Sequence, residues 1–246
     1  MTARTFRFIA FCVTAVFLFS ESAVAQQVSI SLGDDGSLSA RTLQLIALIT
    51  VLSLAPGLAI MITCFPFIVT VLSILRQGIG LQQSPPNMLI VSLAIFLTYF
   101  VMEPVFIDAW KDGIAPLLNE TIPVETAVER ALVPFRIFMA NRMDAETFSA
   151  LAALRPDAAT IQSGPDGPLS VLVPSFLLSE ISRAFQIGFL VFLPFLIIDL
   201  VVAAVLMSMG MMMVPPAIVS LPFKLAFFVI ADGWTLIADS LVRGYF

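Results

Sequence analysis

Charged side chains inside strongly apolar segments are the residues of this sequence best placed to do chemistry. Asp199 lies in the apolar run 195–205, and Lys224 lies in the next apolar segment of the chain. A charge costs several kcal/mol in hydrocarbon, so such groups face protein or a water-filled cavity. Four roles stay open for Asp199: a relay for protons or ions, an ion pair with Lys224 between subunits, a buried structural ion pair, or a hydrogen bond at a helix end.

The carboxylates also allow one enzymatic interpretation. Asp199 and Asp232 suggest the paired acids of an aspartyl intramembrane protease, in which two carboxyl groups share a proton. However, the segment Ala231-Asp232-Gly233-Trp234 lacks the GxGD pattern of those proteases. The chain also contains no histidine, which removes the commonest general base and the commonest metal ligand. We therefore expect no enzymatic activity, no metal and no cofactor.

A further set of polar residues precedes the third apolar segment. Glu180 and Arg183 are three residues apart, a spacing that lets two side chains pair on one helix face. The pair has two interpretations, a solvated helix face or a polar contact that fixes the register between subunits. Arg76, at the end of the first apolar segment, is a candidate polar contact of the same kind.

A cluster of methionines ends the third apolar segment. It comprises Met207, Met209, Met211, Met212 and Met213, and is followed by Pro215-Pro216. Methionine is unbranched and polarisable, so it repacks around varied shapes. A ring of such side chains can seal a pore and still yield to a passing chain, whereas the plainer interpretation is that they fill gaps between helices. The two prolines predict a sharp loop, because proline cannot continue the hydrogen bonding of a helix.

The composition predicts a membrane protein. Hydrophobic residues make up 59% of the 246 residues and charged residues only 12%, which is too little polar surface for a soluble domain of this size. The net charge of −5 and the lack of a basic run argue against binding to nucleic acid. The predicted fold class is all-α, a polytopic membrane protein with proline-broken helical hairpins.

The N-terminus, residues 1–25, has the pattern of a cleavable secretory leader. Two arginines precede the short apolar run 8–19, and Ala23-Val24-Ala25 forms a cleavage pattern. Cleavage between Ala25 and Gln26 is expected, because the run is shorter than the ~20 residues that cross a bilayer. The alternative is an uncleaved first membrane helix. Residues 26–42 are polar and are expected to form a flexible entry.

Two apolar helical hairpins are predicted in the remainder. The first covers residues 43–107 and the second residues 187–246, separated by an amphipathic helical region at 108–186 that holds most of the charged residues. A cleaved leader would put this middle region outside the cytoplasm. Prolines are expected to break the apolar helices. The predicted breaks lie at Pro56, Pro66, Pro194, Pro215, Pro216 and Pro222.

Local signals place the helices of the middle region. Thr121 is expected to cap one helix that has Pro123 in its first turn, and Asp144 to cap a second. Pro174 is expected to open the helix that becomes the third apolar segment.

Longer motifs show a resemblance to a known family. The run PSFLLSEISRAFQIGF at 174–189 resembles the signature helix of the FliP family of flagellar export-gate proteins. The similarity continues in PFLIIDL at 194–200, MGMMMVPP at 209–216, LPFKL at 221–225, LRQ at 75–77, Gly80 and PPN at 85–87. It covers roughly residues 43–246.

The resemblance implies an assembly and a location. Several copies of the chain would assemble with FliQ and FliR into a closed helical gate in the flagellar basal body, at the bacterial inner membrane. Unfolded flagellar subunits would cross there, driven by the proton motive force and companion export proteins, while the chain itself is not an enzyme. Much of the hydrophobic hairpin would be lifted out of the bilayer and buried between subunits.

The resemblance also assigns roles to residues. The methionine-rich loop is similar to the pore gasket of the family, which carries over to Met211, Met212 and Met213, with Met209 beside them. Asp199 and Lys224 become candidate contacts between subunits or with the lumen. This chain has Pro66-Phe67 where many members have Thr-Arg, so any contact of that arginine is not expected here.

Two other functions are compatible with the sequence. One is a virulence-type secretion gate of the same superfamily, which genomic neighbourhood would separate from a flagellar one. The other is a small-solute transporter, which would need a binding site at the membrane midplane and usually paired repeats.

Overall fold

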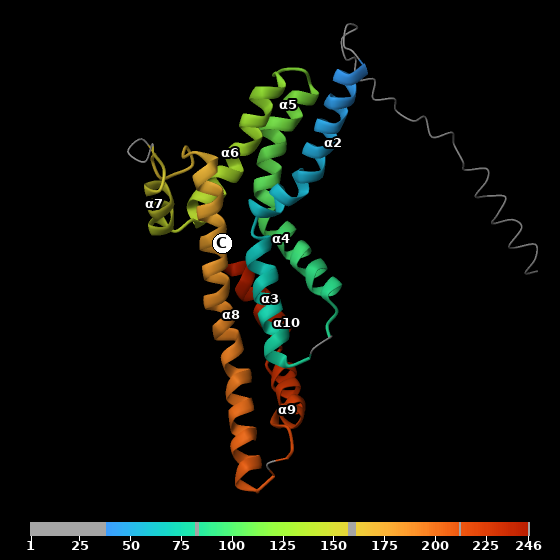
Figure 1. Cartoon of the computed structure of the whole chain (residues 1–246), viewed down its shortest axis with the longest axis vertical. Helices are drawn as coiled ribbons and strands as arrows, with labels where there is room; N and C mark the ends of the chain where they lie inside the picture. The colour runs from blue at the N-terminus through green and yellow to red at the C-terminus, as the bar shows by residue number, and fades with distance from the viewer. Residues whose placement is uncertain (1–37, 82–83, 157–160, 212, 246) are drawn as a thin grey trace, which may run out of the picture. The chain divides into compact units, whose positions relative to one another are not determined.

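The computed structural model describes residues 38–81, 84–156, 161–211 and 213–245 (Figure 1). Within these ranges every regular element is a helix, which confirms the all-α class. The helices are α2 (Leu38–Met61), α3 (Phe65–Ile79), α4 (Asn87–Ala109), the π-helix η1 (Trp110–Ile114), α5 (Ala115–Leu118), α6 (Val124–Arg142), α7 (Ala145–Ala153), α8 (Leu169–Ser208), α9 (Pro216–Ile230) and α10 (Gly233–Arg243).

The chain divides into two units, residues 1–51 and 52–246. The first unit is described only from Leu38, as the first part of α2. The expected leader, its cleavage site at Ala25 and Gln26, and most of the entry segment lie outside the described residues. The packing discussed below belongs to residues 52–246.

Three of the predicted helix breaks lie at helix starts. Pro66 is in the first turn of α3, and Pro215 and Pro216 are the N-cap and first residue of α9. Proline suits these positions, because the first amides of a helix have no partner within it. The first apolar segment is therefore two helices, as expected, separated at Ile62–Cys64.

The other three prolines do not end their helices. Pro56, Pro194 and Pro222 lie inside α2, α8 and α9, so the prediction that they break these helices is wrong. In apolar surroundings a freed backbone group finds no water, which favours continuing a helix past one missing hydrogen bond. The break in the fourth segment instead falls between α9 and α10, where Asp232 takes a left-handed conformation with φ 48°.

Three helical segments are long and apolar enough to cross a membrane: Thr42–Met61, Asn87–Leu118 and Leu169–Ser208. The pair α9 and α10, bent by 61°, would make a fourth if it acts as one span. Helix α8 has 40 residues and is about 60 Å long, twice the ~30 Å core of a bilayer. It runs unbroken across the predicted domain boundary at 186–187.

Helix α3 packs along α8 (Figure 1). Ala184 and Gly188 of α8 are buried and four residues apart, so they lie on one face. A Cβ atom at Gly188 would lie 2.4 Å from Ile74 Cδ1. Helices in lipid associate through close packing of small residues rather than through the hydrophobic effect. The missing side chain at Gly188 therefore sets how closely these two helices approach.

The middle region corrects two of the predicted helix starts. Thr121 does not cap α6; its hydroxyl donates to the Pro116 carbonyl, and Pro123 occupies the N-cap. Helix α8 begins at Leu169, so Pro174 lies inside it rather than opening it. In both cases a proline one residue before the helix already supplies an extended backbone, and the helix starts there without a side-chain cap.

Asp144 caps α7 as predicted. Its carboxylate accepts hydrogen bonds from the Thr147 amide at 2.8 Å and the Thr147 hydroxyl at 2.8 Å. These bonds hold the pKa of the Asp144 carboxyl below its ordinary value. The Asp144 amide in turn donates to the Ser179 hydroxyl of α8 at 2.9 Å, which fixes the start of α7 on that helix.

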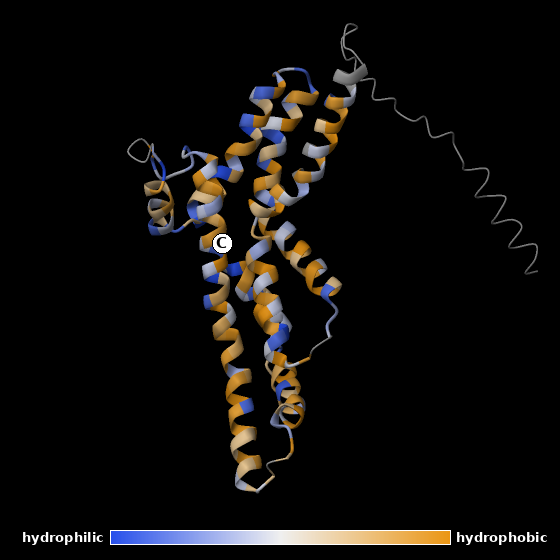
Figure 2. Ribbon diagram, viewed as in Figure 1, coloured by the Kyte–Doolittle hydropathy of each residue, from blue (hydrophilic) through white to orange (hydrophobic). Residues whose placement is uncertain are grey.

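The buried residues form two clusters, and much of the outer surface is apolar. One cluster joins α3, α4, α8, α9 and α10, and the other joins α6, α7 and the first part of α8. Figure 2 shows hydrophobic residues along most of α8 and α9. Many are exposed, among them Phe189 at 61%, Leu200 at 62% and Ile230 at 86%. Exposed apolar area of this extent marks surfaces that lipid or other protein chains cover.

We predict that Gly188→Leu destabilises the fold and that Gly57→Leu does not. The first substitution forces Ile74 away from α8 and should lower the free energy of unfolding by roughly 1–3 kcal/mol. The second adds a side chain where no atom lies within 4 Å, and leucine is the better helix former by up to ~1 kcal/mol. Thermal unfolding of the full chain in detergent, followed by circular dichroism, would test this. Equal midpoints for the two variants would contradict the packing described.

Candidate functional site

The first candidate site is an ionic centre around Lys224. The Lys224 ammonium of α9 lies 2.7 Å from Asp199 Oδ2 of α8 and donates to the Gly78 carbonyl of α3 at 3.0 Å. The Ser220 hydroxyl donates to Asp199 Oδ1 at 2.6 Å. The Lys224 side chain is 7% exposed and the Asp199 side chain 41%. Lys224 is thus enclosed by its own chain, whereas Asp199 keeps an open side.

The end of α3 is shaped to receive this ammonium. Gly80 takes a left-handed conformation with φ 88° that ends the helix. The last carbonyls of a helix carry partial negative charge, and the Gly78 carbonyl is among them. Gly78 also lacks a side chain where a Cβ atom would lie 2.9 Å from the Phe195 ring. Three helices therefore meet at Lys224. Lys224 of α9 pairs with Asp199 of α8, and Gly78 lets the backbone of α3 come close to Phe195 of α8.

This geometry bears on one of the roles left open for Asp199. The ion pair with Lys224 lies within one chain, which matches the role of a structural ion pair. Asp199 keeps enough exposure to contact a second group as well.

The second candidate site is a buried carboxylate at Glu180 of α8. The Glu180 side chain is fully buried and lies 3.1 Å from Arg142 Nε and 3.3 Å from Arg183 Nη1. The Tyr245 hydroxyl donates to its other oxygen. The predicted pairing of Glu180 with Arg183 is confirmed. Glu180 itself is fully buried, so it does not lie on a solvated face.

Arg142 connects this carboxylate to the end of the chain. Its Nη1 donates to the Gly244 carbonyl at 2.6 Å, and its guanidinium carbon lies 4.0 Å from the centre of the Tyr245 ring. The Tyr245 ring also stacks on Phe138 and meets Phe67 edge-on. Phe67 is thus an apolar wall of this centre.

Sequence reasoning missed Arg142 and Tyr245. They lie 38 and 65 residues from Glu180, beyond any local spacing rule. One signal was available, since a glutamate on an otherwise apolar helix needs cations and donors that one arginine three residues away does not fully supply.

The remaining predicted residues have distinct surroundings. The Arg76 guanidinium donates to the Asn87 side chain, which links the end of α3 to the start of α4 within the chain. Asp199 is bound by Lys224 and Ser220, whereas the Asp232 carboxylate accepts from the Thr235 hydroxyl at 3.1 Å. The two aspartates therefore have separate partners, and the geometry gives no support to an aspartyl protease dyad. Among the described residues no group of three or more metal-ligating side chains gathers.

The methionine loop joins α8 and α9. Met209 is 67%, Met211 42% and Met213 97% exposed, and Gly210 turns the chain with φ 73°. The amide of Met211 donates to the Leu206 carbonyl at 3.0 Å, which closes the helix end. Met212 lies outside the described residues. The described methionines project from the loop and do not fill the core of this chain.

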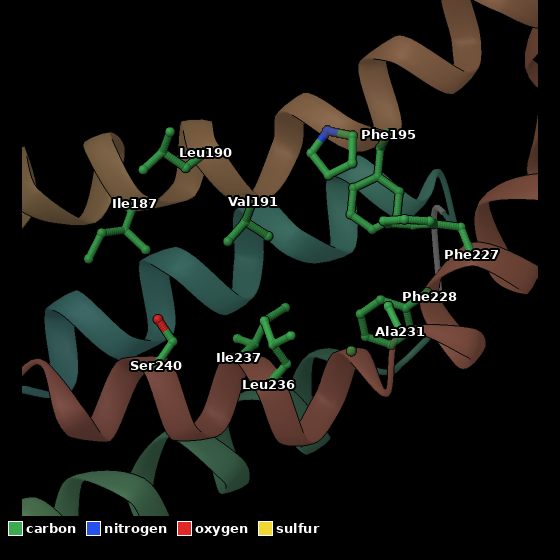
Figure 3. Close-up of a pocket in the computed structure, with 12 residues that line it drawn as sticks. Ile187, Leu190, Val191, Phe195, Phe227, Phe228, Ala231, Leu236, Ile237 and Ser240 are labelled. Carbon is green, nitrogen blue, oxygen red and sulfur yellow. The ribbon is translucent and has the colours of Figure 1, made fainter.

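An apolar cleft of ≈ 330 Å³ lies between α8, α9 and α10. Figure 3 shows Val191 and Phe195 of α8 opposite Ile237 of α10, with Phe227 and Phe228 at one end. Its lining contains almost no polar side chain, Ser240 excepted. Such a cleft suits an apolar side chain or an acyl chain rather than a polar substrate.

Fold and sites together define a class: a helical membrane protein that pairs Glu180 and Lys224 within the chain and leaves large apolar faces exposed. The comparisons give the particular family. The FliP family profile matches residues 48–241, and the chain belongs to that family.

Individual members of the family are similar in sequence to this chain over most of their length. The chain is 50% identical over 234 residues to the flagellar biosynthetic protein FliP of Caulobacter vibrioides, covering 94% of this chain and 87% of the relative. It is 49% identical over 212 residues to FliP of Agrobacterium fabrum, 86% of each chain. It is 46% identical over 208 residues to FliP of Bacillus subtilis, 83% of this chain and 92% of the relative.

We predict an asymmetry between the partners of the first ionic centre. Asp199→Asn leaves an enclosed ammonium without its carboxylate, and should lower the free energy of unfolding by roughly 1–3 kcal/mol, allowing for the exposure of Asp199. Lys224→Met leaves a carboxylate that still reaches solvent and Ser220, so it should cost less. The double variant Asp199→Leu/Lys224→Met should be more stable than Asp199→Asn.

The control for this comparison is Asp239→Asn. It breaks an ion pair with Arg243 whose side chains are 54% and 79% exposed, and it should change stability by less than about 1 kcal/mol. Thermal unfolding midpoints in detergent would rank the four variants. A larger loss in Lys224→Met than in Asp199→Asn would be incompatible with the enclosed ammonium.

We predict that Tyr245 ionises late and makes the fold sensitive to alkali. Burial, and then the Glu180 carboxylate, raise the pKa of the Tyr245 phenol far above its ordinary value. The folded state therefore favours the neutral phenol, and its contribution is complete below the unfolded pKa of ~10 and is lost as the pH rises further. The chain has two tyrosines, and Tyr99 is exposed. Phenolate absorbance should show one late step that Tyr245→Phe removes and Tyr99→Phe retains.

Proposed function

We propose that this chain is a core subunit of the flagellar type III protein export gate. In this proposal several copies assemble with FliQ and FliR in the bacterial inner membrane, within the flagellar basal body. Together they form the closed pore through which unfolded flagellar subunits pass, and the chain acts without catalysis. The observation that carries the proposal is the match to the FliP family over residues 48–241, with relatives named as flagellar biosynthetic proteins.

The distribution of charge and apolar surface supports an assembled subunit. Glu180 and Lys224 find their ionic partners inside the chain, so they do not depend on neighbours. The outer faces of α4, α8 and α9 expose large apolar side chains, such as Phe96, Phe189 and Ile230. These faces need lipid, other copies, or FliQ and FliR to cover them. The cleft in Figure 3 is one such face.

The methionine loop supports the gasket role. Met209, Met211 and Met213 project from a turn at one end of α8, and Met212 lies between them in the sequence. If several copies surround a pore, these loops would present a collar of flexible thioether side chains. Methionine repacks at low cost, so such a collar would close around empty space and around an unfolded chain alike.

The relatives favour the flagellar system over the virulence-type gate. The three compared here, from Caulobacter, Agrobacterium and Bacillus, carry flagellar names. Asp199, the intramembrane carboxylate that a solute site would use, is occupied by Lys224 and Ser220. A transporter site built on Asp199 is therefore the weaker alternative.

A replacement experiment tests the function and the gasket together. In a Caulobacter strain that lacks its own FliP, this chain should restore motility and secretion of flagellar subunits without ion leak. The variant with alanine at Met211, Met212 and Met213 should assemble, because Met211 and Met213 are exposed rather than part of the core, but it should leak ions. Alanine at Met61 and Met88, both exposed but distant from the loop in sequence, is the matched control and should not leak.

The outcomes separate the two parts of the proposal. Failure of the unaltered chain to restore secretion, although it is made and inserted, would contradict the gate function. Restored secretion without leak in the methionine variant would contradict the gasket and leave these residues as ordinary packing. Assembly would be followed in each strain by native electrophoresis of the complex.

A further inference from the structure

The passage from α8 to α9 gathers side chains that share one reactive group, an exposed thioether. Within the described residues it is the one place where three or more exposed methionines lie within a single turn and loop. They are Met207, Met209, Met211 and Met213. Met61 and Met88 are also exposed, but each stands alone in its part of the sequence. Any chemistry of the thioether group is therefore concentrated at the methionine loop.

Two methionines in the interior provide the contrast. Met102 of α4 is 0% exposed and Met139 of α6 is 1% exposed, and each belongs to one of the two buried clusters. A reagent in solution reaches a sulfur atom only where the side chain is open to it. The loop sulfurs should therefore react well before those of the core.

The loop presents only apolar side chains. From Met209 to Val214 the sequence contains methionine, glycine and valine. The hydroxyl of the neighbouring Ser208 donates to the Val205 carbonyl at 2.7 Å, so it is turned back onto the helix. A narrow apolar constriction closes a pore by excluding water. A collar built from such loops would therefore seal only while its thioethers stay apolar.

We propose that the methionine loop is a site of oxidation by hypochlorous acid, and that this oxidation opens the seal. The proposal rests on the gate function proposed above. Each sulfur gives up two electrons and gains an oxygen atom. The chlorine of hypochlorous acid takes the two electrons and leaves as chloride, and its hydroxyl proton is released. The resulting sulfoxide is polar, so water enters the constriction and ions follow.

The first test measures the modification itself. The full chain in detergent would be treated with limiting hypochlorous acid, and peptide mass mapping would give the rate at which each methionine gains oxygen. Met209 and Met213 should react roughly tenfold faster than Met102 and Met139. Equal rates in the loop and the core would contradict the selectivity that the exposures imply.

The second test measures the consequence in the assembled gate. The complex containing this chain would be purified from the Caulobacter strain described above and reconstituted into vesicles, and ion leak would be followed before and after oxidation. The leak should rise several-fold. With leucine at Met209, Met211, Met212 and Met213 it should not rise above its own starting value, because leucine is of similar volume but has no sulfur.

Two further variants separate the loop from other exposed methionines. Met61→Leu/Met88→Leu should leave the oxidant-induced rise in place. Met211→Gln/Met213→Gln places polar side chains in the loop and should leak without oxidant, whereas Met61→Gln/Met88→Gln should not. All four positions are exposed, so these pairs differ chiefly in their place in the chain.

The results that would overturn the proposal differ from those that would overturn the gate function. Loop sulfoxides without a rise in leak, in a complex that restores secretion, would reject the opening of the seal and leave the gate function intact. An equal rise in the leucine variant would place the damage outside the loop. Failure of the unaltered chain to restore secretion would reject the gate function, and with it the effect assigned to oxidation.

Discussion

The enclosed Lys224 ammonium is the interaction on which the arrangement of the apolar helices depends. It bonds a carboxylate on α8 and a backbone carbonyl at the end of α3, and so ties α9 both to α8, the preceding helix, and to α3, which is far away in sequence. In lipid, apolar faces alone do not fix the register of one helix against another, because the hydrocarbon of the lipid is as apolar as a leucine side chain. A charge that must be paired supplies the missing specificity. The close contact between Gly188 and Ile74 then fixes the separation of α3 and α8.

The Glu180 centre repeats this principle nearer the start of α8. Phe67, near the start of α3, packs on Tyr245, which donates to Glu180, while Gly78 near its end accepts from Lys224. Helix α3 is therefore held toward both of its ends. The last residues of the chain join the core through Arg142. The same two centres also hold the other helices in place. Arg142 attaches α6 to the Glu180 centre, and Lys224 attaches α9 to α3 and α8. Helix α10 is held by Gly244 and Tyr245, the residues that follow it.

The sequence predicted the chemistry of these residues better than their geometry. Buried charge in apolar segments identified Asp199, Lys224 and Glu180, and the Asp144 cap followed from a local rule. Proline marked helix starts at Pro66, Pro215 and Pro216 but not breaks at Pro194 and Pro222, because a helix in apolar surroundings continues past one lost hydrogen bond. The true break lies at the dipeptide Asp232-Gly233, a turn signal in its own right, where a Cβ atom at Gly233 would lie 2.2 Å from the Phe228 ring. The roles of Arg142 and Tyr245 were not predicted, because no short-range pattern encodes contacts across many tens of residues.

These features imply that the molecule has a stiff frame, made of α3, α8 and α9, and a soft end, the methionine loop. The ionic centres immobilise α3, α8 and α9 against one another, and every partner they use is internal. The loop from Met209 to Val214 has no ion pair among its described residues, and Met209, Met211 and Met213 are exposed. A gate of the proposed kind needs both properties, since a seal must deform around each passing chain while the subunits that carry it stay in place. If the charges were instead shared between subunits, opening would have to break them. Because they are kept within each chain, the loops can move without disturbing the frame.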